Sequence, residues 1–189
     1  MGKSEIKVEI LERPEEKDWQ RCKMLALATQ GKESRKPVEE EWKIKMLRAE
    51  HSPIRTLRFL IRMEIPYFCS VHLCRHKIGV EHYVRSQRKE GDGLTPARGA
   101  ERQDVPVTHI MEINAQALMQ MARTRLCNRA DQTTQAVMQE IVKQTLSLNP
   151  EFKGFLEPKC RYLQRCDEIK SCGLTHKINF FNLRFTNAR

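Results

Sequence analysis

The sequence contains no run approaching the roughly 20 consecutive apolar residues that a membrane helix requires. Its first 19 residues also hold no apolar block of the kind found in secretion signals. No G-x-G-x-x-G segment follows a predicted strand, which argues against a Rossmann-type dinucleotide site. These absences predict a soluble, cytoplasmic protein with no membrane partner.

The seven cysteines are odd in number and lack a secretory context, so we expect reduced thiols and not a disulfide framework. Cys160, Cys166 and Cys172 are evenly spaced, and His176 follows them. Such a set could bind zinc, or an iron–sulfur cluster through its cysteines. The spacing is wider than the C-x-x-C of well-attested sites, which favours unligated thiols and predicts no metal.

The length of 189 residues, with 40% hydrophobic side chains, fits one domain with one core. Apolar and polar residues alternate over residues 57–65, which predicts a half-buried strand, and residues 6–11 predict a shorter one. Helical spacing predicts helices near 19–28, 39–47, 113–126 and 132–146. Because the strands precede most helices, we expect an α+β domain whose sheet is packed with helices. The cysteine-containing segment from about residue 157 is interpreted as a C-terminal extension of it.

A net charge of +10 predicts attraction to phosphorylated partners. The densest cationic run begins at Arg75 and His76 and continues to residue 89. It directly follows the apolar segment FCSVHLC, so its first residues should emerge from buried structure. Arginine presents a planar fork of donors that suits phosphate oxygens. The alternative is a solvated basic face. Farther along, Asn114 and Arg125 lie eleven positions apart, about three helical turns, and should share a helix face.

Several short motifs resemble the signature of flavin-dependent thymidylate synthases, and they occur in the same order. The resemblance spans about residues 51–150 and rests on the segments His51-Ser52-Pro53, Arg75-His76-Lys77, Ser86-Gln87-Arg88, Val105-Pro106, Asn114-Ala115-Gln116-Ala117-Leu118 and Arg125-Leu126. No cysteine has the P-C-H setting of the other thymidylate synthase family. The chain is identified as a divergent member of the flavin-dependent family.

The resemblance implies the fold of that family and FAD-dependent methylation of dUMP to dTMP. Methylenetetrahydrofolate would be the carbon donor and NADPH the reductant, in a homotetramer whose active sites lie between subunits. It further implies two sets of site residues. The substrate would be bound by Arg75, Ser86, Arg88, Arg102 and Arg125, with Arg125 also catalytic. The flavin would be bound by His51, Arg75, His76 and Asn114.

Departures from the signature leave alternatives open. Val80, His82 and Tyr83 stand where the family has Ser, Asn and Glu. A flavoenzyme of the same fold acting on another pyrimidine nucleotide would explain them. A basic module that binds nucleic acid, with a metal at the C-terminal cysteines, is an alternative from a different class, although nucleic acid is not the partner we expect.

Overall fold

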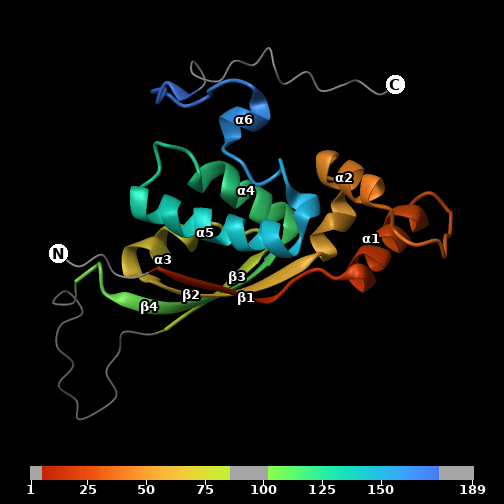
Figure 1. Ribbon diagram of the computed structural model, residues 1–189, viewed down its shortest axis with the longest axis horizontal. Helices are drawn as coiled ribbons and strands as arrows, with labels where there is room; N and C mark the ends of the chain where they lie inside the picture. The colour runs from red at the N-terminus through yellow and green to blue at the C-terminus, as the bar shows by residue number, and fades with distance from the viewer. Residues whose placement is uncertain (1–5, 86–101, 175–189) are drawn as a thin grey trace, which may run out of the picture.

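A four-stranded antiparallel sheet forms the base of the protein (Figure 1). The structure, a computed structural model, describes residues 6–85 and 102–174. The strand order is β1-β2-β4-β3. The strands are β1 (Lys7–Glu12), β2 (Arg58–Pro66), β3 (Val80–Val84) and β4 (Pro106–Asn114). The two long strands, β2 and β4, pair along their whole length and form the centre of the sheet.

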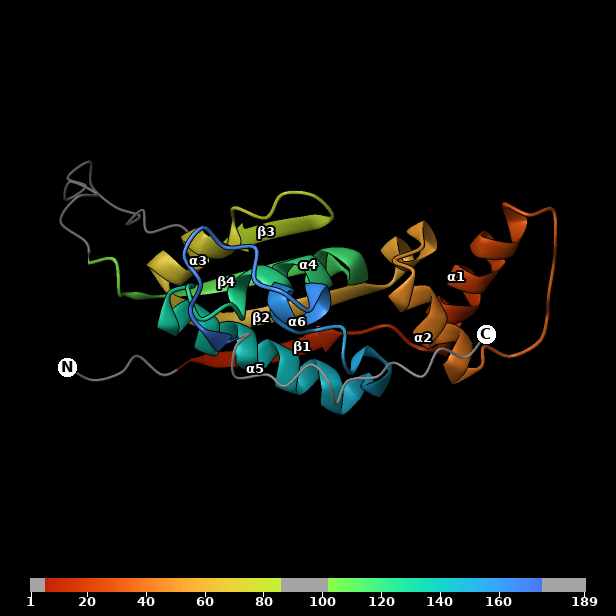
Figure 2. The ribbon, with the colours of Figure 1, turned by 90° about the horizontal axis from the view of Figure 1, so that it is seen from above.

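The helices lie mainly on one face of the sheet (Figures 1 and 2). α3, α4 and α5 cover the strands, whereas α1 and α2 lie toward one end, and α6 packs over α4. Their bounds are α1 (Glu16–Ala28), α2 (Glu40–Arg48), α3 (Tyr67–Leu73), α4 (Ala115–Arg125), α5 (Gln132–Leu148) and α6 (Lys159–Leu163). Two short 3₁₀ turns, Ser52–Thr56 and Pro150–Phe152, complete the described elements.

The core lies between the sheet and the helix layer. Alternate residues of the central strands point into it because side chains of a strand alternate between the two faces. The buried inner positions are Phe59, Ile61, Met63, Ile65, Val107, His109, Met111 and Ile113. Burying each large apolar side chain contributes roughly 1.5–3 kcal/mol. One inner position is a histidine, which marks this part of the core as unusual.

The other face of the sheet is polar and charged. Arg58 and Glu112 form an ion pair of 2.6 Å across β2 and β4, and Thr108 donates to Glu64 over 2.8 Å. In the described part of the chain, no helix packs on this face (Figure 1).

A buried carboxylate ties the N-terminal helix to the end of α5. The Trp19 indole N–H donates to Glu151 Oε1 over 2.9 Å, and the Asn149 side-chain amide donates to the same oxygen over 3.1 Å. Glu151 is 9% exposed, so these donors replace water at a charge that would otherwise be costly to bury.

The α+β class, with a sheet packed by helices, is confirmed. The order of elements was predicted only in part: β3 and β4 were missed, and β4 follows α3, so the strands do not all precede the helices. The helix predicted over 113–126 begins at Ala115, because residues 113 and 114 still belong to β4. No described helix is long and apolar enough to cross a membrane.

Candidate functional site

The turn between α3 and β3 carries the first residues of the cationic run. Pro66 closes β2 and stands as the N-cap of α3, which buries Cys69, Ser70 and Leu73 against the core. The helix ends at Leu73, and residues 74–79 then lead to β3. Arg75 and His76 therefore leave a buried helix, as the sequence predicted.

Arg125, the last residue of α4, reaches across to this turn. Its Nε donates to His76 Nε2 over 3.1 Å, and its Nη2 donates to the carbonyl of His72 in α3. These two contacts hold the half-buried guanidinium in one orientation. Arg125 and the turn thus form one structural unit, although 49 positions separate Arg125 from His76.

Burial and neighbouring charges determine the ionisation of this unit. Burial, then the charge of Arg125, then that of His82, lower the pKa of His76 to about 4. His76 is therefore neutral near pH 7. Because its Nε2 accepts from Arg125, the ring proton must reside on Nδ1, where no described residue accepts it. This leaves an N–H donor beside a guanidinium.

Arg75 precedes His76, the hydrogen-bond partner of Arg125, and its charge acts on Arg125. Burial lowers the pKa of Arg125, and the charge of Arg75 lowers it further. In the described ranges, neither Arg75 nor Arg125 forms an ion pair with a carboxylate. Two guanidinium groups that repel each other without a local counter-ion favour a bound anion.

A hydrogen-bonded pair of histidines extends from the turn into the core. His82 on β3 bonds through Nε2 to the carbonyl of His76 over 2.8 Å, and through Nδ1 to Nε2 of His109 over 2.9 Å. His109 is fully buried, and its Nδ1 has no partner within the described chain. Ligand-type atoms of Cys74, His82 and His109 lie within 4.8 Å of one another. The His72 ring differs, since its Nδ1 meets Thr134 Oγ1 at 2.8 Å.

Asn114 contacts the same turn and caps α4. Its Oδ1 accepts from the Ala117 amide over 2.9 Å, and its backbone N–H donates to the Gly79 carbonyl over 2.9 Å. Gly79 has φ of 76°, and a Cβ added there would stand 2.3 Å from the Asn114 amide nitrogen. Asn114 and Arg125 therefore face the same turn, from the two ends of α4. The Oδ1 contact is a structural role, so a role of Asn114 toward flavin stays a prediction.

The remaining predicted site residues are not joined to this unit within the described chain. His51 is exposed at the start of the 3₁₀ turn Ser52–Thr56, and no described side chain hydrogen-bonds to its ring. Arg102 forms a two-armed ion pair with Asp104, at 2.8 and 2.6 Å, beside the start of α3 and not beside the turn after it. Ser86 and Arg88 lie outside the described residues.

Comparison with known proteins gives matches in structure only. No family model matches the sequence, and no curated protein does. Thymidylate Synthase X from Helicobacter pylori, solved with FAD and dUMP, matches with a TM-score of 0.63 and 14% identity, over 80% of this chain and 97% of that one. The UMP/dUMP methylase PolB from Streptomyces cacaoi, bound with 5-Br dUMP, matches with a TM-score of 0.62 and 15% identity, over 79% and 93%. The same methylase bound with 5-Br UMP gives 0.57 and 15%, over 80% and 95%.

These matches define the fold. The chain has the fold of flavin-dependent thymidylate synthases. At this level the resemblance drawn from the sequence motifs is confirmed, and the low identity agrees with a divergent sequence.

Proposed function

We propose that this protein methylates a pyrimidine nucleotide, with dUMP as the first candidate substrate and dTMP as its product. FAD would be the cofactor, methylenetetrahydrofolate the carbon donor and NADPH the reductant. The observation that carries the proposal is Arg125, held by hydrogen bonds to His76 and to the His72 carbonyl without a carboxylate partner, with Arg75 next to His76 in the same turn. Solved structures of this fold hold dUMP, 5-Br dUMP or 5-Br UMP, each a nucleotide with a phosphate.

Each residue of this unit suits one part of an anionic nucleotide. Arg125 is oriented by two hydrogen bonds, so ordering it around a phosphate or a charged pyrimidine carbonyl costs little further entropy. Arg75 is exposed and adds a second charge. His76 offers its Nδ1–H to an oxygen of the ligand without adding a positive charge of its own.

The same residues fit the phosphates and carbonyls of a flavin nucleotide. When bound, a reduced flavin supplies hydride, a chemistry that no amino-acid side chain provides. The protein's part is to hold the ligands ring against ring and to stabilise negative charge on the pyrimidine. His51, Asn114 and Arg102 are proposed to contribute to this assembly from outside the unit described above.

A homo-oligomer, which we take to be a tetramer, would complete the site. The contacts of one chain leave His51 apart from the turn after α3, and the outer sheet face carries no helix in the described residues. A second subunit would bring the separated residues together. Light scattering behind a sizing column measures the mass, and a strict monomer at high concentration would contradict this part of the proposal.

A second candidate is a methylase that uses UMP. It is favoured by the likeness to a UMP/dUMP methylase and by His82 and Tyr83 at positions where the signature differs. The two candidates differ only in whether the ribose 2′-hydroxyl is accepted.

Two measurements test the proposal. Titration with FAD, followed by absorbance, should show binding at micromolar concentration. Incubation with FAD, NADPH, methylenetetrahydrofolate and either dUMP or UMP, with product analysis by mass, should show a methylated nucleotide from dUMP. Methylation of UMP alone would favour the second candidate, whereas no flavin binding and no product would reject both.

A further inference from the structure

The end of the described chain has almost no core of its own. No residue in 157–174 is buried, and α6 buries no side chain. Its clearest contact with the rest of the protein is Tyr162, whose ring centre lies 3.8 Å from the guanidinium carbon of Arg123 on α4. Segments with so little apolar burial usually need a covalent or metal staple to stay folded.

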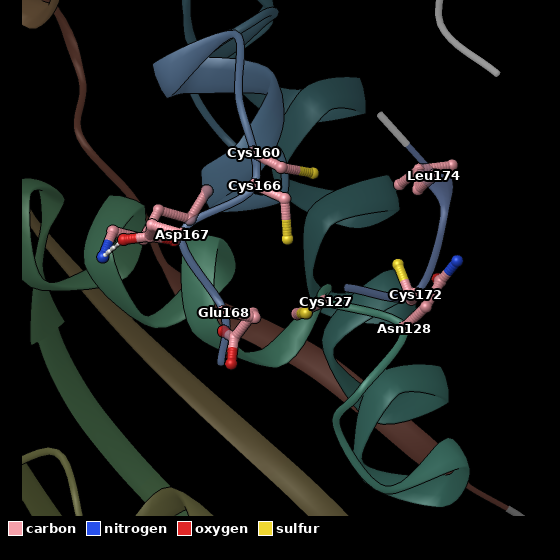
Figure 3. A pocket seen from close by; sticks show the side chains of 9 residues that line it. Cys127, Asn128, Cys160, Cys166, Asp167, Glu168, Cys172 and Leu174 are labelled. Carbon is pink, nitrogen blue, oxygen red and sulfur yellow. Dashed lines mark ion pairs between the residues drawn. The ribbon is translucent and has the colours of Figure 1, made fainter. Parts of the chain in front are cut away.

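Four cysteines gather where this segment meets α4. Cys127 follows directly after α4, Cys160 belongs to α6, and Cys166 and Cys172 lie in the chain beyond it. All four line one cavity, and Figure 3 shows their side chains turned toward it from separate stretches of the chain. All four are free thiols, and they make up the majority of the seven cysteines in the sequence.

We propose that Cys127, Cys160, Cys166 and Cys172 bind one zinc ion that anchors the C-terminal segment to the end of α4. Four thiolates satisfy the tetrahedral preference of zinc and leave no open position, which is the arrangement of a structural site. The cavity has a volume of about 10 Å³, room for about one water-sized sphere. This space suits a single ion better than a cluster of several irons.

The local backbone supports this assignment. The Arg129 amide N–H donates to Cys127 Sγ over 3.5 Å, two residues after the cysteine. Such N–H···S contacts orient a thiolate and disperse its charge around a metal. Charged residues of both signs line the cavity as well, since Lys159 forms an ion pair with Asp167 there and Glu168 lies beside them.

The sulfurs are spread more widely than in a closed zinc site, where each lies about 2.3 Å from the metal. No three of them lie within 4.8 Å of one another, a spacing that Cys74, His82 and His109 do reach among the described residues. Metal binding would therefore draw residues 160–172 toward Cys127. In the group of Cys74, His82 and His109, the two histidines already form a hydrogen bond with each other. This group serves as the competing site in the test.

Proton release should accompany binding. Burial raises the pKa of the Cys160 thiol, and the neighbouring Cys127, Cys172 and Cys166 raise it further. Zinc binds the thiolate forms, so affinity for the ion should rise with pH.

The test uses the full-length protein, purified under reducing conditions and dialysed without chelator. Metal content is measured by inorganic mass spectrometry, and Co²⁺ is substituted for the native ion to record its absorption spectrum. We expect one zinc per chain and a cobalt spectrum with sulfur charge-transfer bands and tetrahedral d–d bands. Cys166→Ser should reduce the bound metal to background, whereas Cys74→Ser should retain one ion per chain.

Several outcomes would overturn the proposal. These are a metal-free protein that takes up no Co²⁺, disulfides among the four cysteines, or an iron–sulfur chromophore. Loss of metal in Cys74→Ser with retention in Cys166→Ser would place the ion at the histidine pair instead. The wild-type metal content and cobalt spectrum decide the matter even if a variant fails to fold. The inference does not depend on the proposed methylation.

Discussion

Replacing Gly79 by alanine should destabilise the protein strongly, because this residue lies between α3 and the cap of α4. Alanine at φ of 76° costs about 1–2 kcal/mol from backbone sterics alone. The added Cβ would stand 2.3 Å from the Asn114 amide nitrogen, a distance that forces a shift costing a further 1–3 kcal/mol or so. If Asn114 moves, the α4 cap weakens by roughly 0.5–2 kcal/mol. The expected loss is therefore about 2.5–7 kcal/mol.

Gly154 provides the matched control. It has φ of 85°, and an added Cβ would meet no atom within 4 Å, so Gly154→Ala should show only the backbone cost of about 1–2 kcal/mol. Urea unfolding of both variants gives the free energies, and thermal melts should differ by about 2–4 °C for each kcal/mol in a chain of this size. Equal losses in the two variants would refute the packing of Gly79 against Asn114.

Two further predictions concern buried polar groups. Burial, then the charge of His82, lower the pKa of His109 to about 4, against about 6.5 in the unfolded chain. The contribution of the neutral His109 ring to stability is therefore full above pH 6.5 and is lost as pH falls toward 4. At pH 5 the loss of unfolding free energy should be roughly 1–2 kcal/mol. His109→Gln should reduce the difference in unfolding free energy between pH 7 and pH 5. An unchanged difference would contradict this prediction. Trp19→Phe removes a donor to the buried Glu151 carboxylate and should cost about 1–3 kcal/mol in urea unfolding, whereas a cost below about 0.5 kcal/mol would show that the bond contributes little.

The central strand and the helices were predictable because their patterns are local. Strand β2 alternates apolar and polar residues over most of its length, and Phe59, Ile61, Met63 and Ile65 are buried as that pattern predicts. Strand β4 alternates in the same way, but His109 occupies an inner position and interrupts the apolar series. Strand β3 is short and lies within the cationic run, whose charged residues obscure the pattern that would predict a strand paired with β4.

For the candidate site, the sequence predicted only what the order of the family motifs implied. The family order placed Arg75, His76 and Arg125 together; in the structure Arg125 hydrogen-bonds to His76, and Arg75 precedes His76 in the same turn. The pairing of His82 with His109 depends on strand register, which short motifs do not encode. Cys127 was missed for a similar reason, since it meets the C-terminal cysteines only after α6 folds back over α4.

The most direct test of the central claim is calorimetric binding of dUMP to FAD-loaded protein with Arg125→Ala. Losing an oriented, charge-assisted contact of roughly 1.5–3 kcal/mol should weaken binding on the order of tenfold or more, and Arg75→Ala should act in the same direction. Arg161→Ala, an exposed arginine of α6, should bind dUMP as the unmodified protein does. Thermal melts confirm that each variant is folded. If folded Arg125→Ala and Arg75→Ala bind dUMP with unchanged affinity, the two arginines are a solvated basic face and the proposed nucleotide site is contradicted.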